Sequence, residues 1–201
     1  MILFFDVETN GLPKSPMGTY TDIENWPRVV QLAWALCDND GKNCTRKNFI
    51  IFPKDFDIPE RNSLIHGITI KKAEKDGVLI NRVLEEFNDD LKRANLIVAH
   101  NIGFDLPVIN AEFIRSKMNT PLLEKEKYCT MTSPEIVAYC KIPSSSGIGY
   151  KWPSLFELHN KLFKKSFEDS HNAAADVDAC INCYFALKEK KIIKKIDIIE
   201  I

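Results

Sequence analysis

The chain has 201 residues, of which 45% are hydrophobic, and this is enough apolar material for one sizeable core. Its 27 basic and 28 acidic side chains nearly cancel, which excludes the global positive field that drives non-specific binding along duplex DNA. The sequence shows no export-type leader and no apolar run approaching about 20 residues, so we expect a cytoplasmic protein with no membrane association. Without a linker between comparable halves, we expect one domain over 1–190 and a tail at 191–201.

Three apolar segments in the first quarter of the chain are typical of β-strands. They cover residues 2–7, 28–37 and 48–53, and the turn residues from Asp38 to Gly41 separate the last two. This arrangement predicts an antiparallel meander at the start of the fold.

From residue 78 onward the apolar residues take a helical period. Val83, Phe87 and Leu91 have the spacing of one helix face, and an apolar strand at 95–100 and a helix at 106–117 follow. Strands that alternate with helices favour an α/β fold in which some strands are parallel.

The last third of the chain contains further helix signals. We expect one helix to begin near Pro134, a loop over 144–153, and a capping box at Ser154 that starts the next helix. The last long helix is expected at about 172–190, and the structure of the tail is not assigned.

The six cysteines are expected to be free thiols, because the chain carries no export signal. They are Cys37, Cys44, Cys129, Cys140, Cys180 and Cys183. Cys180 and Cys183 have a spacing that could suit zinc, but there is no second such pair, and this spacing also places both on one helix face. We therefore favour packing over metal binding for them.

Two carboxylates stand at the end of the first predicted strand. In a strand, residues i and i+2 point to the same side, so Asp6 and Glu8 project together while Val7 faces the other layer. A solvated strand end or a helix cap is the alternative interpretation of this pair.

A third carboxylate, Asp105, follows the strand at 95–100. It could cap the helix predicted from Leu106. If the strands at 2–7 and 95–100 pair in parallel, however, their carboxyl ends meet at one edge, and Asp105 would lie across from Asp6 and Glu8.

The fourth carboxylate, Asp176, begins the last long helix. It shares a helix face with Cys180, Cys183 and Leu187, and these apolar members direct that face against the sheet. His171 precedes Asp176 by five residues, so we expect it on the entering loop, reaching over the same site. The alternatives are a charge favourable to the helix dipole for Asp176 and a surface or capping role for His171.

Four inward carboxylates cannot share a site without a strong counter-charge, since like charges raise each other's pKa values. An all-oxygen site suits Mg²⁺ or Mn²⁺ better than zinc. The sequence therefore predicts a divalent-metal site.

Three motifs, taken in order, resemble the DEDD superfamily of 3′-to-5′ exonucleases in its histidine branch. The first, D-x-E-T with a following G-L, matches Asp6 to Leu12; the second, H-N-x-x-F-D, matches His100 to Asp105; the third, H-x-x-x-x-D, matches His171 to Asp176. The segment at 64–69 is also similar to the family, and the resemblance covers about residues 1–188. The stretch at 13–27 is longer than in compact members, and its role is left open.

The resemblance implies a ribonuclease H-like fold with a five-stranded mixed β-sheet flanked by α-helices. It implies two Mg²⁺ or Mn²⁺ ions held by Asp6, Glu8, Asp105 and Asp176, with His171 as the general base. The product would be a 5′-mononucleotide. The residues expected to bind the substrate are Thr9, Gly11, Leu12, Ile65, His66, Asn101 and Phe104, although Leu12 and Ile65 could equally belong to the core.

The expected partner is a nucleic acid with a free 3′ end, and a DNA polymerase is a further candidate partner. A metal-dependent endonuclease of the same fold and a catalytically silent module that binds a polymerase or RNA are the competing functions. The sequence leaves the choice of DNA or RNA, and the oligomeric state, open.

Overall fold

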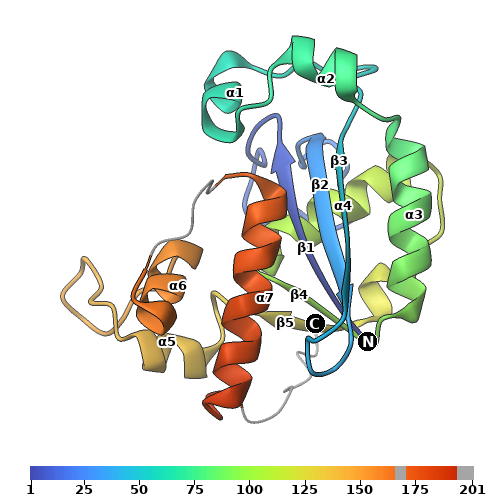
Figure 1. Cartoon of the computed structure of the whole chain (residues 1–201). Coiled ribbons are helices and arrows are strands. Elements are labelled where there is room, and N and C mark those ends of the chain that lie inside the picture. Colours follow the sequence, from blue (N-terminus) through green and yellow to red (C-terminus); the bar gives the residue numbers. More distant parts are fainter. Residues whose placement is uncertain (166–170, 194–201) are drawn as a thin grey trace.

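A five-stranded mixed sheet forms the centre of the molecule in this computed structural model, which describes residues 1–165 and 171–193. Helices cover both faces of the sheet (Figure 1). The strands are β1 (Ile2–Thr9), β2 (Val29–Cys37), β3 (Cys44–Ile50), β4 (Leu96–Ala99) and β5 (Glu126–Cys129). The helices are α1 (Glu60–His66), α2 (Ile70–Asp76), α3 (Ile80–Arg93), α4 (Ile102–Arg115), α5 (Pro134–Cys140), α6 (Leu155–Phe163) and α7 (Ala173–Glu189), with a short 3₁₀ turn at Leu122–Glu124.

The strands are arranged in the order β3-β2-β1-β4-β5, so β1 is the central strand. β1 pairs with β2 in antiparallel register and with β4 in parallel register. The predicted meander and the predicted parallel pairing are therefore both confirmed. β1 and β4 consequently place their carboxyl ends at the same edge, which lies beneath α1 and beside the start of α7 (Figure 1).

The two faces of β1 pack into different cores. Phe5 belongs to the core beneath α3 and α4, where it meets Phe87 with ring centroids 5.8 Å apart in an edge-to-face geometry. Phe4 belongs to the core beneath α7, where it meets Tyr184 with ring centroids 5.3 Å apart. The alternation of β1 therefore divides its side chains between two helical layers.

Three helices begin where the sequence predicts, and one of them is α5, which starts at Pro134. Ser154 and Glu157 form the predicted capping box at the start of α6, with reciprocal hydrogen bonds of 3.2 and 2.8 Å. Asn172 caps α7, and Cys180 and Cys183 on its inner face are buried in the core beneath that helix. Their spacing is thus explained by packing.

Several boundaries differ from the predicted ones. β3 begins at Cys44 instead of residue 48, and α4 begins at Ile102, so that Pro107 lies inside the helix. The sequence pattern did not locate α1, α2 or β5, because these elements have seven, seven and four residues and are too short to show a period. The predicted tail at 191–201 lies outside the described residues from 194 onward.

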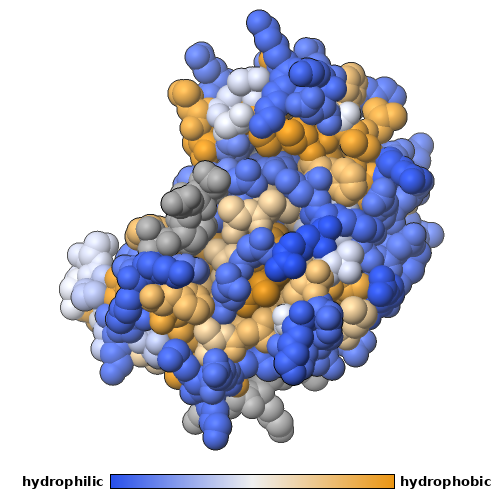
Figure 2. All heavy atoms as spheres, in the orientation of Figure 1, coloured by the Kyte–Doolittle hydropathy of each residue, from blue (hydrophilic) through white to orange (hydrophobic). Residues whose placement is uncertain are grey.

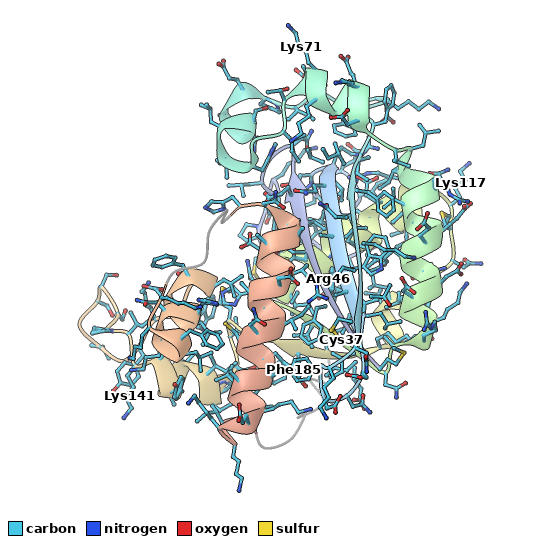
Figure 3. All side chains as sticks on the ribbon, in the orientation of Figure 1. Cys37, Arg46, Lys71, Lys117, Lys141 and Phe185 are labelled. Carbon is cyan, nitrogen blue, oxygen red and sulfur yellow. A yellow bond between two sulfur atoms is a disulfide. The ribbon has the colours of Figure 1, made fainter. Side chains whose placement is uncertain are left out.

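The expectation of six free thiols is wrong for two of them. Cys37 and Cys44 form a disulfide across the hairpin of β2 and β3. The two residues are directly opposite each other in the antiparallel register, a proximity that the absence of an export signal could not reveal. The bond lies at the sheet end opposite the carboxyl edge of β1, since Cys37 pairs with Ile2, and Figure 3 shows Cys37 far from α1.

Among the described residues, no helix combines the length and the apolar character needed to cross a bilayer.

Reduction of the disulfide is expected to lower the free energy of unfolding by about 2 kcal/mol, because the bond closes only a short loop and so restricts the unfolded chain modestly. Thermal unfolding with and without dithiothreitol measures this effect, and the double variant Cys37→Ser/Cys44→Ser should lose the dependence on the reductant. Thiol titration of the unreduced, unfolded protein should find the four free cysteines that the structure describes. Finding all six as thiols would contradict the disulfide.

Candidate active site

Three carboxylates from two distant segments meet at the carboxyl edge of β1. One oxygen each of Asp6, Glu8 and Asp176 lies within 4.8 Å of the others. Asp6 and Glu8 project from β1 on the face that α7 covers, while the side chain of Val7 points into the opposite core. The sequence prediction that Asp6, Glu8 and Asp176 share a site is thus matched by their placement.

Asp105 approaches the same edge from the other helical layer. It lies in the first turn of α4, is 3% exposed, and its Oδ1 accepts a hydrogen bond of 3.1 Å from the Val7 amide. The alternative that Asp105 caps a helix beginning at Leu106 is wrong, because the helix begins four residues earlier, at Ile102. The peptide group of Val7, between Asp6 and Glu8, therefore fixes Asp105 beside them.

His171 lies on the turn that enters α7, as predicted. Its backbone amide donates a hydrogen bond of 3.1 Å to Oδ2 of Asp176, and its φ of 70° is in the left-handed region. The side chain is exposed, and His171 partly offsets the rise in the pKa of Asp176 that burial causes. The turn thus brings an imidazole close to the carboxylates and leaves it accessible to solvent.

Burial raises the pKa values of all four carboxyl groups, and repulsion between carboxylates adds to this effect for Asp6, Glu8 and Asp105. Burial is the largest cause for Asp6, followed by the charges of Asp105, Asp176 and Glu8. Burial and then the charges of Asp176 and Asp105 raise the pKa of Glu8 to about 8. Burial also raises the pKa of Asp105, against the hydrogen bond from Val7, and that of Asp176, against the His171 amide.

The donor set fits a divalent cation. The three clustered side chains offer only carboxylate oxygens, the ligands that Mg²⁺ and Mn²⁺ prefer, and a bound cation would lower the raised pKa values of these groups. Asp6, Glu8 and Asp176 could hold such an ion directly, with Asp105 beside them.

Gln31 has a positioning role that the sequence reasoning missed. It is the cross-strand partner of Glu8 on β2. Its Oε1 accepts from the Ala173 amide at 3.3 Å, and its Nε2 donates to Asn48 at 2.9 Å. Gln31 therefore attaches the first turn of α7, which carries Asp176, to the strand next to β1. No local motif marks this residue, because its contact spans 142 positions.

The residues expected to bind substrate differ in how far they are exposed to solvent. Thr9 is buried, and its hydroxyl donates to the Gly11 carbonyl at 2.7 Å. Leu12 is 83% exposed and Ile65 is 56% exposed, so neither belongs to the core. Figure 2 shows hydrophobic atoms gathered along the α1–α2 region and a hollow between it and the α5–α6 region.

His66 is the last residue of α1 and lies beside Thr9 at the end of β1. Its Nδ1 accepts from the Ile68 amide at 3.1 Å, and burial lowers its pKa, an effect that the neighbouring Thr9 backbone partly offsets. Its buried Nε2 makes no hydrogen bond of normal geometry within the described part of the chain. Because Nδ1 accepts the hydrogen bond from Ile68, a ring proton lies on Nε2, at the edge of the site.

Asn101 and Phe104 line an apolar groove of about 750 Å³ next to the carboxylates. The first turn of α4 forms one wall, and the remaining lining comes from the 12–26 segment, from β5 and the residues after it, and from Trp152. The complete lining is Leu12, Pro13, Pro16, Tyr20, Trp26, Asn101, Ile102, Gly103, Phe104, Leu106, Lys127, Cys129, Thr132 and Trp152.

The segment at 13–27, whose role the sequence left open, forms a wall of this groove. Asn110 of α4 donates to the Tyr20 carbonyl at 2.9 Å, and Arg115 donates to the carbonyls of Ile23 and Trp26. Within the segment, Gly18 lies so close to Asn25 that an added Cβ would be 2.0 Å from the amide nitrogen of that side chain. The segment is therefore a fixed structure anchored to α4.

The profile of one protein family, RNase T, described as an exonuclease, matches residues 3–184. The chain belongs to this exonuclease family. No protein with curated annotation is a significant match in sequence.

Solved structures of exonuclease I share the fold of this family member. The E. coli enzyme in complex with a dT13 oligonucleotide matches with a TM-score of 0.74 and 20% identity over 94% of this chain and 41% of its own. Exonuclease I from Methylocaldum szegediense matches with a TM-score of 0.72 and 19% identity over 97% of this chain and 41% of its own. The zinc-bound E. coli ExoI-ssDNA complex matches with a TM-score of 0.70 and 21% identity over 94% and 40%.

This exonuclease-family chain therefore spans about two fifths of the length of those proteins. At such identities the likeness establishes the fold, and the predicted ribonuclease H-like architecture with its five-stranded mixed sheet is confirmed.

With a chelator present, the protein is expected to become more stable as the pH falls from about 8 to about 6. The raised pKa of Glu8, about 8, means that the folded state holds a proton that the unfolded state releases, so this stability is lost as the pH rises through the folded-state value. Each such group contributes up to about 1.4 kcal/mol per pH unit.

The midpoint of thermal unfolding across this pH range measures the effect. Glu8→Gln should flatten the slope, because it removes one of the titrating groups. A midpoint that falls on acidification in the wild-type protein, with no change in Glu8→Gln, would contradict the electrostatic description of the site.

Proposed function

We propose that this protein is a metal-dependent 3′-to-5′ exonuclease of the histidine branch, which releases 5′-mononucleotides from single-stranded nucleic acid. The observation that carries the proposal is the convergence of Asp6, Glu8 and Asp176 within 4.8 Å, with Asp105 fixed beside them by the Val7 amide. Hydrolysis of a phosphodiester needs a positive charge near the phosphate, and this arrangement has the ligands to hold one.

In this proposal Asp6, Glu8, Asp105 and Asp176 hold two Mg²⁺ or Mn²⁺ ions. When bound, the ions neutralise the phosphate and lower the pKa of a bound water. Support comes from the all-oxygen donor set and the raised pKa values, which bound cations would reverse. The zinc-bound form of the E. coli exonuclease I complex is a neighbour in which a divalent ion binds.

His171 is proposed to take the proton from the attacking water. Imidazole is the side chain most often used as a general base at neutral pH. Support for this role comes from the backbone hydrogen bond to Asp176, which holds the residue at the site, and from the exposure of the side chain.

The substrate is proposed to be a single strand with a free 3′ end. Structural neighbours are E. coli exonuclease I complexes with dT13 and dA16 oligonucleotides. With a net charge of −1, the chain has little electrostatic attraction for a duplex. The exposed side chains of Leu12 and Ile65 are available to contact a terminal base. Thr9, Gly11, His66, Asn101 and Phe104 complete the proposed binding surface.

The competing functions lack a specific observation in their favour. An inactive module would gain nothing from four carboxylates with raised pKa values, because removing such a cluster would stabilise the fold. One structural neighbour is an ExoI/SSB-Ct complex, so a polymerase partner has no support from it and stays a prediction.

The decisive experiment follows single-stranded DNA and RNA oligonucleotides of the same sequence, labelled at the 5′ end, with Mn²⁺ or with chelator. A ladder that shortens one nucleotide at a time, and only with metal, is expected. Asp105→Asn serves as the inactive control. Cleavage of a closed circular single strand would contradict the requirement for a free end, and full activity in chelator would overturn the metal assignment.

His171→Ala and Asp176→Asn are expected to fail in different ways. Asp176→Asn replaces a charged ligand with a neutral one, so Mn²⁺ affinity and turnover should both fall, while the metal-free protein should melt at a higher temperature because repulsion is relieved. His171→Ala should keep Mn²⁺ affinity nearly intact and lower the chemical rate by roughly 10²- to 10⁴-fold.

Calorimetric Mn²⁺ titration and single-turnover kinetics on both variants separate the two roles. Loss of the acidic limb of the pH–rate profile in His171→Ala would support a general base. If His171→Ala lost metal affinity as severely as Asp176→Asn, His171 would instead be a ligand.

A further inference from the structure

Trp152 is an exposed aromatic residue at the groove, and the proposed metal site gives no reason for its exposure. Of the three tryptophans, Trp34 is fully buried and Trp26 is 6% exposed, whereas Trp152 is 61% exposed. It is nevertheless one of the lining residues of the apolar groove, together with Phe104 and Leu12. A large flat ring is thus presented to solvent beside the site.

The backbone that carries Trp152 is fixed to the sheet edge by His100. Nε2 of His100 donates to the Pro153 carbonyl at 3.1 Å, and Nδ1 accepts from the Thr130 hydroxyl at 3.0 Å. Burial lowers the pKa of His100 to about 4, so the ring stays neutral and keeps this donor and acceptor pattern at physiological pH. His100 directly precedes Asn101 at the start of α4, so it positions Trp152 relative to the turn that carries Asp105.

The groove lies against the first turn of α4, because the residues from Asn101 to Phe104 line it, and Asp105 follows them in the same turn. Its lining is mainly apolar and aromatic, which suits the faces of bases. Lys127 also lines it, although its ammonium donates hydrogen bonds to the carbonyls of Leu123 and Lys125 at 2.7 and 2.8 Å. The aromatic lining beside Asp105 favours an extended nucleic-acid strand over an apolar small molecule.

We propose that Trp152 is the stacking platform for a base upstream of the 3′-terminal nucleotide, and that it thereby selects single strands. The proposal rests on the proposed exonuclease function. It adds a binding site for the nucleotides on the 5′ side of the scissile bond. A base can lie flat on an indole only after it leaves its own stack and its partner strand, so a paired strand cannot use this platform.

Tryptophan fluorescence tests the contact directly, because Trp152 is the exposed indole of the three. The probe is a ten-nucleotide oligothymidylate with a terminal phosphorothioate linkage, which resists hydrolysis, titrated in the presence of Mg²⁺. Quenching is expected in the wild-type protein and in Tyr150→Ala, a control that removes an exposed aromatic from the same loop but outside the groove. Trp152→Phe should lose the quenching and retain most of the affinity, since a phenyl ring still stacks.

Steady-state kinetics separate this proposal from the function on which it rests. Two substrates are compared, the unmodified ten-nucleotide strand and the p-nitrophenyl ester of thymidine 5′-monophosphate, which carries no upstream base. For Trp152→Ala, the ratio of kcat/KM on the strand to kcat/KM on the ester should fall about 5- to 100-fold, mainly through KM on the strand. Trp152→Phe should restore most of that ratio, and Trp152→Ala should lose much of the preference for single strands over blunt duplex.

The outcomes are distinguishable. If the wild-type protein cleaves both substrates with metal, but Trp152→Ala keeps the wild-type ratio and the oligonucleotide does not quench Trp152, the stacking role is wrong while the exonuclease function stands. If the wild-type protein cleaves neither substrate, the proposed function itself fails, and the platform with it.

Discussion

Repulsion among carboxylates at the carboxyl edge of β1 is the constraint on which the rest of the structure depends. The described chain meets it with backbone groups: the Val7 amide donates to Asp105, and the His171 amide donates to Asp176. Both acids also lie in the first turns of long helices, α4 and α7, where the helix dipole favours negative charge. Each of these contacts uses one carboxylate oxygen and adds no positive charge, so the other oxygens remain available to an external cation.

The division of β1 between two cores explains why the site needs the whole fold. Asp6 and Glu8 face the layer of α7, whereas Asp105 comes from the layer of α4 and reaches the edge past Val7. The site is therefore complete only when both helical layers have docked on the sheet. Any change that loosens either layer will disturb the carboxylates, even when it lies far from them.

The sequence could predict those features that depend on local periods. The alternation of β1 places Asp6 and Glu8 on one face, and the inner face of α7 directs Asp176 toward the sheet, so both followed from spacing alone. Contacts between distant segments were not predictable in this way. Gln31 anchors α7 across 142 positions, and the Cys37–Cys44 bond depends on the strand register. Neither leaves a local signature.

The attachment of the 13–27 segment to α4 links the groove wall and the carboxylates through one helix. Asp105 lies in the first turn of this helix, and Asn110 and Arg115 farther along it hold the segment that forms a groove wall. One helix thus sets the distance between Asp105 and the groove wall, independently of the flanking loops. In the proposed function, a strand held against this wall would therefore meet the carboxylates at a spacing that α4 fixes.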